Sequence, residues 1–269
     1  MTKRRISLVL SDIDGTLVTD DKRLTQASID AVRRLKRAGI RFAIASSRPP
    51  RGMAMFVKPL QIETPIAGFN GGVFTRPDLS IIKQQIIDPR IAKQSLEHLS
   101  RAGLSVWLFS GNDWLVKDPN GPHVAHETHT VDFAPTVVRS FDDRLAAANK
   151  IVGVSDDHAL IERCEAEAKT LFGSGASISR SQPYYLDITS IRANKGVVAD
   201  FLASHLNVPK EEIATIGDSQ NDVFMFKRSG FSIAMGNASR DVKAEANVTT
   251  DTNQEDGFAR AIDQFILSA

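Results

Sequence analysis

Three apolar runs in this sequence each end in a cluster of polar side chains that could do chemistry. The clusters are Asp12 with Asp14, Ser46 with Ser47 and Arg48, and Asp218 with Asn221 and Asp222. The runs are short, aliphatic and β-branched, and each is cut off by a turn signal, which predicts buried strands of a parallel sheet. Because open α/β sheets bind ligands at the carboxyl ends of their strands, we expect the three clusters to share one site.

The first cluster holds two carboxylates one residue apart, Asp12 and Asp14, directly after the run at 6–10. Side chains on extended backbone repeat every two residues, so both carboxylates are predicted to point the same way. Two like charges this close are costly unless a cation, a proton or an electrophile takes up the charge. Taken alone, the pattern also fits an Asp-Gly turn, with Gly15 allowing the tight exit, or the metal motif of glycosyltransferases. The later clusters favour a catalytic site.

Together these residues supply what phosphoryl transfer needs. A carboxylate nucleophile forms an aspartyl-phosphate and splits one difficult displacement into two easier ones. A second carboxylate donates a proton to the leaving oxygen and later takes one from water. The Ser46 hydroxyl, nearby backbone N–H groups and Lys195, a lone lysine that begins a predicted helix, offer hydrogen bonds and positive charge to phosphate oxygens. A carboxylate-lined pocket that faces a phosphate also calls for Mg²⁺.

The elements around these clusters alternate between strand and helix. Leu24–Gly39 is predicted as a helix with Thr25 as its N-cap, and it connects the first strand to the second. This order predicts an α/β fold with a Rossmann-like parallel sheet. The rhythm changes near residue 83 and returns at Lys195. We therefore predict a core of residues 1–82 and 189–269 and an inserted α+β domain of residues 83–188.

Four motifs follow one another along the whole chain. They are Asp-x-Asp-Gly-Thr-Leu at 12–17, Ser-x-Arg at 46–48, Asn-Lys-Gly at 194–196 and Gly-Asp-x-x-Asn-Asp at 217–222. This set, in this order, resembles the haloacid dehalogenase superfamily. The size and position of the insertion, between the second and third motifs, are similar to those of the Cof-type branch, which carries an α/β cap (type C2B). The sequence departs from that branch at Ser47, where glycine is usual.

The resemblance implies a catalytic role for four residues. Asp12 would be the nucleophile and Asp14 the general acid/base. Ser46 would hydrogen-bond the transferring phosphoryl group, and Lys195 would neutralise its charge. Arg48 follows in the same motif, but we interpret it as the ion-pair partner of an acidic neighbour.

The resemblance also implies a Mg²⁺ site and further phosphate contacts. The metal residues would be Asp12 and Asp218 through their carboxylates, Asp14 through its main-chain carbonyl, and Asp222 as a support of the metal. The phosphate contacts would include Gly15, Ser47 and Asn221. Taken alone, Asp222 also fits an acid that favours the dipole of a helix N-terminus.

Three histidines in the insertion, His123, His126 and His129, stand with Glu127 at a spacing that resembles a metal site. They lie in a polar stretch rich in proline and glycine, at 118–136, which favours a solvated cap loop. Contact of one histidine with the substrate is the intermediate interpretation, and a second metal site is the third. Trp107 and Trp114 are predicted as cap core, and Cys164 as a small buried hydrophobe.

The composition is that of an ordinary globular protein and excludes several classes of partner. The chain has 269 residues, of which 42% are hydrophobic and 24% charged, with a net charge of +1. Without a long basic block, neither nucleic acid nor a charged membrane surface is expected as a partner. No apolar stretch approaches the about 18 residues that span a bilayer, and the basic stretch at 3–5 precedes a run too short for a signal peptide. With one cysteine and no internal disulfide, we expect a cytoplasmic protein.

The sequence therefore predicts a Mg²⁺-dependent phosphatase that hydrolyses a small phosphorylated metabolite through an aspartyl-phosphate. By resemblance, the substrate class is a sugar phosphate or a phosphorylated cofactor. A phosphomutase is the nearest alternative, because related capped proteins return the phosphate to a sugar. A non-catalytic sensor that binds a phosphorylated ligand is the alternative from another class, and the intact set of Asp12, Asp14, Lys195 and Asp218 disfavours it. The oligomeric state is not predicted.

Overall fold

A five-stranded parallel sheet forms the centre of the core in this computed structural model, which describes residues 5–268. Its strands, in spatial order, are β14 (Val248–Thr249), β13 (Phe231–Ala234), β12 (Ile213–Gly217), β1 (Leu8–Ser11) and β2 (Arg41–Ile44). Chain order reverses at β1, which lies between β12 and β2, so the crevice at its carboxyl end is a natural ligand site. Residues 1–4 and 269, which include most of the basic stretch and both ends of the predicted core, lie outside the described residues.

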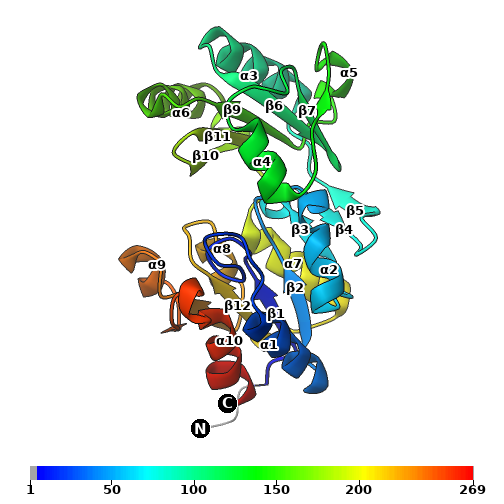
Figure 1. Ribbon diagram of the computed structural model, residues 1–269, viewed down its shortest axis with the longest axis vertical. Helices are drawn as coiled ribbons and strands as arrows, with labels where there is room; N and C mark the ends of the chain where they lie inside the picture. Colours follow the sequence, from blue (N-terminus) through cyan, green and yellow to red (C-terminus); the bar gives the residue numbers. More distant parts are fainter. Residues whose placement is uncertain (1–4, 269) are drawn as a thin grey trace.

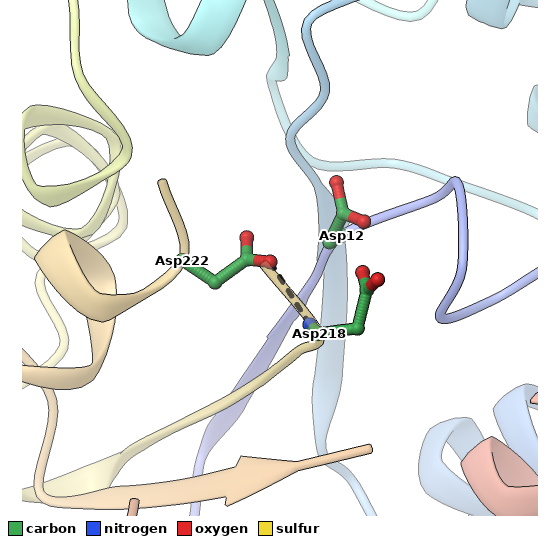
Figure 2. A group of neighbouring side chains, drawn as sticks. All are labelled: Asp12, Asp218 and Asp222. Carbon is green, nitrogen blue, oxygen red and sulfur yellow. Dashed lines mark hydrogen bonds between the residues drawn. The ribbon is translucent and has the colours of Figure 1, made fainter. Parts of the chain in front are cut away.

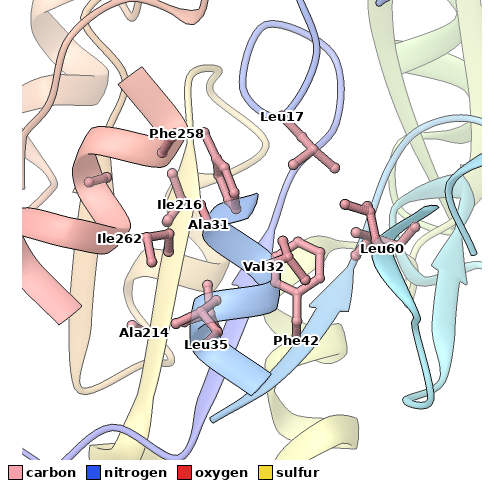
Figure 3. Close-up of a cluster of buried hydrophobic side chains, with 14 of the residues drawn as sticks. Leu17, Ala31, Val32, Leu35, Phe42, Leu60, Ala214, Ile216, Phe258 and Ile262 are labelled. Atoms are coloured by element: carbon pink, nitrogen blue, oxygen red, sulfur yellow. The ribbon is translucent and has the colours of Figure 1, made fainter. Parts of the chain in front are cut away.

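Helices cover both faces of this sheet. On one face lie α1 (Gln26–Arg37), α2 (Ala54–Leu60), α10 (Gly257–Ala261) and the π-helical turn η5 (Ile262–Leu267). On the other lie α7 (Lys195–Leu206), α8 (Val223–Phe226) and α9 (Arg240–Ala244). Figure 3 shows how Val32, Phe42 and Phe258 pack together on the first face. Thr25 caps α1 as predicted, because its side chain accepts a hydrogen bond from the Ser28 N–H.

A small antiparallel sheet stands beside the end of β2. It contains β3 (Ile66–Gly68), β4 (Val73–Thr75) and β5 (Ile81–Gln84). The short 3-10 turns of the core are η1 (Pro50–Met53), η2 (Phe69–Gly71), η3 (Lys210–Glu212) and η4 (Asn253–Glu255). The turn η2 joins β3 to β4 in a hairpin at Asn70, which has a left-handed backbone (φ 55°).

The insertion forms a separate cap (Figure 1, green) built on a mixed six-stranded sheet. The order is β10 (Ala176–Gln182), β11 (Tyr185–Ser190), β9 (Lys150–Val154), β6 (Ser105–Ser110), β7 (Asp113–Val116) and β8 (Thr136–Val137). Its helices are α3 (Pro89–Arg101), α4 (Val124–Val131), α5 (Asp142–Leu145) and α6 (His158–Phe172). The α/β fold class with an inserted cap is thus confirmed. The boundaries after residues 82 and 188 remain predictions.

The two faces of the cap sheet differ in what covers them. One face packs against α3 and α6, in a cluster that contains the buried Cys164. The other face turns towards the core, and its aromatic residues Trp107 and Trp114 pack with Phe69 of the core. Both tryptophans are 1% exposed, which confirms that they belong to the buried cap core. The cap and the core are therefore joined by an apolar contact and not by linkers alone.

The prediction of a loop across 118–136 is wrong, because the helix α4 occupies Val124–Val131 and lies on the core side of the cap (Figure 1). Its only fully buried residues are Val124 and Val131, seven positions apart. Such a sparse apolar stripe gives too weak a periodic signal to predict a helix. Among residues 5–268, the structure contains no helix long and apolar enough to cross a membrane.

Candidate active site

The Asp12 carboxylate and the Lys195 ammonium form a buried ion pair at the carboxyl end of β1. Asp12 follows the last residue of β1, and Lys195 is the first residue of α7, which begins after the cap. The Nζ atom of Lys195 donates to Oδ1 of Asp12 and, at 2.6 Å, to Oδ1 of Asp222. The lysine side chain is 1% exposed, so the cation is held entirely by these two carboxylates.

Asp222 fixes the loop that follows β12. Its Oδ2 atom accepts hydrogen bonds from the N–H groups of Asp218 and Ser219, each at 2.9 Å, and Figure 2 shows the first of these. A side chain at Gly217 would collide with the Asp222 carboxylate, so only glycine fits that position. Both carboxylate oxygens of Asp222 therefore accept hydrogen bonds within the protein, one from the loop N–H groups and one from Lys195.

Asp218 lies opposite Asp12 and completes a group of three carboxylates (Figure 2). One oxygen of each of Asp12, Asp218 and Asp222 lies within 4.8 Å of the others. The Thr16 hydroxyl donates to Oδ1 of Asp218 at 3.1 Å. Gly15 comes so close to this carboxylate that a side chain there would collide with it, and its backbone is left-handed (φ 76°), which favours glycine for a second reason.

The three carboxylates carry more negative charge than Lys195 balances. Burial raises the pKa of Asp12, and the charges of Asp222 and Asp218 add to this rise, while Lys195 opposes it. Burial and the charge of Asp222 raise the pKa of Asp218 to about 6. Burial alone would lower the pKa of Lys195, but Asp12 and Asp222 raise it above its usual value. The site therefore favours an additional cation.

Asp14 lies apart from this group and faces the cap. Arg48 donates to both of its carboxylate oxygens, from Nε and Nη2, each at 2.8 Å, and Lys22 lies 2.9 Å from Oδ1. Burial alone would raise the pKa of Asp14, but the hydrogen bonds and charge of Arg48, with those of Lys22, bring the pKa well below its usual value. The predicted strand alternation does not reach Asp14, because β1 ends at Ser11.

Ser46, Ser47 and Asn221 occupy the rim of the same crevice. Ser46 follows β2, is 1% exposed, and its hydroxyl accepts the N–H of Arg48 at 3.1 Å. Ser47 is half-buried and lines a pocket that reaches into the cap. The amide of Asn221 lies 3.4 Å from Oδ1 of Asn70, which lines that pocket too. The predicted polar clusters thus meet at one edge of the sheet.

Comparison with known proteins gives the family. A model of the haloacid dehalogenase-like hydrolases matches residues 9–262, nearly the whole chain. The chain belongs to the haloacid dehalogenase-like hydrolases. A phosphatase of Haemophilus influenzae, itself named as putative, is 29% identical over 258 residues, 95% of this chain and 97% of its own. A 5-amino-6-(5-phospho-D-ribitylamino)uracil phosphatase of Bacillus subtilis is 27% identical over 277 residues, which are 96% of this chain and 97% of the relative.

The fold of a HAD/COF-like hydrolase from Plasmodium vivax, also named as putative, matches with a TM-score of 0.89 at 19% identity. It covers 100% of this chain and 98% of that one, cap included. The expected fold of the Cof-type branch is therefore confirmed. The comparisons also confirm the expected enzyme class, a phosphatase of the haloacid dehalogenase-like hydrolases.

The structure adds two residues to the haloacid dehalogenase-like site that the sequence alone did not identify, Lys22 and Asn237, and it gives Arg48 a second contact. Arg48, interpreted as a simple ion-pair partner, pairs with Asp14 and also donates to the Thr130 carbonyl of α4 at 2.7 Å, so it connects core and cap. Lys22 reaches Asp14 from the loop before α1. Asn237, after β13, donates to the Gly15 carbonyl at 2.8 Å and approaches Asp218 at 3.4 Å. Of the two new residues, Asn237 had a signal in the sequence, since it too follows an apolar strand.

The cap histidines form no metal cluster in the part of the chain that the structure describes, where the three aspartates are the only such group. His123 stacks on Tyr184 with 3.9 Å between ring centroids, and its Nε2 lies 2.7 Å from Asp156. Glu127, in contrast, turns inwards from α4, and the Tyr185 hydroxyl donates to it at 3.4 Å. Glu127 and His123 are half-buried, whereas His126 and His129 are exposed.

Proposed function

We propose that this protein is a Mg²⁺-dependent phosphatase that hydrolyses a small phosphorylated metabolite through an aspartyl-phosphate on Asp12. The observation that carries the proposal is the buried Asp12 carboxylate, which Lys195 holds at the carboxyl end of β1 beside two further carboxylates. An anionic nucleophile, a fixed cation and a place for a metal are what an in-line attack on phosphorus requires.

The residues present fit a magnesium ion. Three carboxylates face one lysine, and the raised pKa of Asp218 reflects charge that the protein leaves unbalanced. Because Asp222 holds Lys195 through one oxygen and two backbone N–H groups through the other, Asp12 and Asp218 would be the direct ligands, with the main-chain carbonyl of Asp14 as a third. Asp222 would then support the metal by holding the Asp218 loop and Lys195. The bound ion would supply charge stabilisation to the phosphoryl oxygens.

The chain's own residues carry out the nucleophilic attack, the charge stabilisation and the proton transfers. The free oxygen of Asp12 attacks phosphorus, while Lys195 and the Ser46 hydroxyl stabilise the charge on the phosphoryl oxygens. Asp14 protonates the leaving oxygen and then takes a proton from the water that hydrolyses the aspartyl-phosphate. Arg48 and Lys22 favour its ionised form, so we expect their contact with Asp14 to loosen while it carries the proton and to form again once the proton has been donated. Gly15, Ser47 and Asn221 complete the phosphate contacts.

The test is phosphate release from a panel of phosphorylated sugars, sugar alcohols, nucleotides and vitamin cofactors, with Mg²⁺ and then with a chelator. We expect turnover that depends on metal and concentrates on one chemical class. The relatives support a small metabolite, since one acts on a phosphorylated ribityl compound and another is named an HMP-PP phosphatase. A folded protein that releases phosphate from no member of the panel in Mg²⁺ would contradict the proposal.

Magnesium affinity should decrease as the pH decreases, because Asp218 must lose a proton to bind the ion. Its pKa of about 6 places this loss below neutral pH, so binding should weaken as the pH falls through 6. In Asp218→Asn we expect affinity at pH 7.5 to drop by more than about tenfold and the pH dependence between 7.5 and 5.5 to flatten. Isothermal titration calorimetry with MgCl₂ alone measures both effects.

The matched control is Asp251→Asn, which changes an aspartate that pairs with Arg260 on the surface. Its magnesium affinity and pH profile should equal those of the parent protein. If Asp218→Asn binds Mg²⁺ as the parent does, then Asp218 is not a metal ligand.

A further inference from the structure

The ligands assigned to the metal come from two loops at the ends of different strands. The first loop, residues 12–20, follows β1, and the second loop, residues 218–222, follows β12. Asp12 of the first loop and Asp218 of the second lie next to each other in Figure 2. Mg²⁺ requires nearly ideal octahedral geometry, so its affinity depends on how firmly the two loops are held together. A residue that joins them would affect metal binding without being a ligand.

Asn237, which follows β13, contacts both loops through one atom of its side-chain amide. Its Nδ2 atom donates to the main-chain carbonyl of Gly15 at 2.8 Å and lies 3.4 Å from Oδ2 of Asp218. An amide nitrogen carries two hydrogens, so it can serve both acceptors at once. The first contact fixes the backbone directly after Asp14, whose carbonyl is assigned to the metal. The second contact reaches the Asp218 carboxylate itself, whose other oxygen accepts from Thr16.

The orientation of this amide is determined from its other end. Oδ1 of Asn237 accepts a hydrogen bond from the main-chain N–H of Asn253 at 3.1 Å. A flipped amide would place its oxygen beside the Gly15 carbonyl and the Asp218 carboxylate, and its NH₂ group against the N–H of Asn253. The observed orientation therefore pairs every donor with an acceptor. Because the Asn237 side chain is exposed, these contacts hold it in place, and burial does not.

Asn253 extends the bridge along the first loop. Its side chain is buried (6% exposed), and its Nδ2 atom donates to the Val18 carbonyl and to Oδ1 of Asp20, each at 3.0 Å. The main-chain N–H of the same residue holds Asn237. The first loop is therefore attached to the bridge at two points, once through each asparagine.

The backbone that presents Asn237 is anchored as well. The N–H of Gly236 donates to the Asp251 carbonyl at 2.9 Å, and the Gly236 carbonyl accepts from Nζ of Lys243 at 2.6 Å. These partners come from the loop after β14 and from α9, which contain none of the residues assigned to the metal. The position of Asn237 is therefore fixed independently of the two loops that it joins, as a preorganised site requires.

We propose that Asn237 is a positioning residue of the magnesium site, which holds the first and second loops at the separation that the ion needs. It acts through the Gly15 carbonyl and the Asp218 carboxylate. Without it, Asp218 would lose one of the two side-chain donors that orient it, and the ion would have to order the loops itself on binding. That ordering lowers affinity. This inference rests on the proposed Mg²⁺ site and adds the residue that preorganises it.

The test is isothermal titration calorimetry of the whole protein with MgCl₂ alone at pH 7.5. We expect Asn237→Ala to lower the Mg²⁺ affinity by about tenfold, as the loss of a partner of a metal ligand typically does. Asn237→Leu keeps a similar size but has no donor, so it should lose as much. The melting temperature without metal, measured by circular dichroism, should change little in both variants, because the side chain is exposed.

A kinetic readout separates positioning from a general loss of structure. With p-nitrophenyl phosphate as substrate, both variants should need about tenfold more Mg²⁺ for half-maximal rate, while kcat at saturating Mg²⁺ stays within about threefold of the parent value. The matched control is Asn112→Ala in the cap, because Nδ2 of Asn112 also donates to a main-chain carbonyl, that of Leu79 at 3.1 Å. Its Mg²⁺ affinity should equal that of the parent protein.

The outcomes separate this inference from the site on which it rests. If the parent protein binds no Mg²⁺, the proposed metal site and the role of Asn237 are both overturned. If the parent binds Mg²⁺ and folded Asn237→Ala and Asn237→Leu bind it within about twofold as well, only the positioning role is overturned. An equal loss of affinity in Asn112→Ala would also overturn it, since the effect would then not depend on the bridge.

Discussion

Asp12→Asn should abolish turnover while the fold survives. An amide oxygen is a poor nucleophile towards phosphorus, so we expect kcat on any substrate found to fall by about four orders of magnitude or more. The substitution keeps the size of the side chain and its contact with Lys195. It also removes one charge from a crowded acidic group, where burial already raises the pKa of Asp12. The free energy of unfolding should therefore change little.

The covalent step has a direct readout besides the rate. When a ³²P-labelled substrate is quenched with acid within one turnover, the parent protein should retain label that hydroxylamine releases, as an acyl phosphate does. Asp12→Asn should retain none. Asp263→Asn, at a carboxylate that pairs with Arg34 on the surface, is the matched control and should behave as the parent protein. Substantial activity in Asp12→Asn would rule out Asp12 as the nucleophile.

The core fold could be predicted because its signals are local. Each apolar strand at 6–10, 40–45 and 213–216 is short, ends in a turn signal and alternates with a helix, so the parallel sheet follows from the sequence. The polar clusters at the strand ends could be placed together for the same reason, because parallel strands bring their carboxyl ends to one edge. The family resemblance added the order of the motifs.

The contacts that cross from core to cap could not be predicted in this way. Arg48 meets the carbonyl of Thr130 at a separation of 82 residues, and nothing in either local sequence indicates the other. Asp187 and Lys150 lie on different cap strands, and each taken alone looks like an ordinary polar residue of a strand. They meet only through the register of the sheet, as an ion pair with 2.6 Å between Nζ and Oδ2. Contacts that depend on tertiary pairing are therefore less visible in the sequence than the polar clusters at the strand ends.

Lys195→Met should remove activity and also destabilise the protein strongly. The lysine lies between Asp12 and Asp222, whose side chains are 6% and 0% exposed, so its loss leaves two buried carboxylates without their cation. Removal of one partner from a buried ion pair typically costs about 3–5 kcal/mol in the free energy of unfolding. Urea denaturation at pH 7.5 without metal measures this loss.

The cause of that destabilisation can be tested in the same variant. If uncompensated negative charge is responsible, added Mg²⁺ should raise the melting temperature of Lys195→Met more than that of the parent protein, since it supplies the missing charge. A second change, Asp222→Asn, should recover part of the stability but none of the activity, because the nucleophile still lacks its cation. A fall in pH should also reduce the deficit, as the carboxylates take up protons. If neither Mg²⁺, nor Asp222→Asn, nor low pH reduces the deficit, then Lys195 stabilises the core through packing and not through charge.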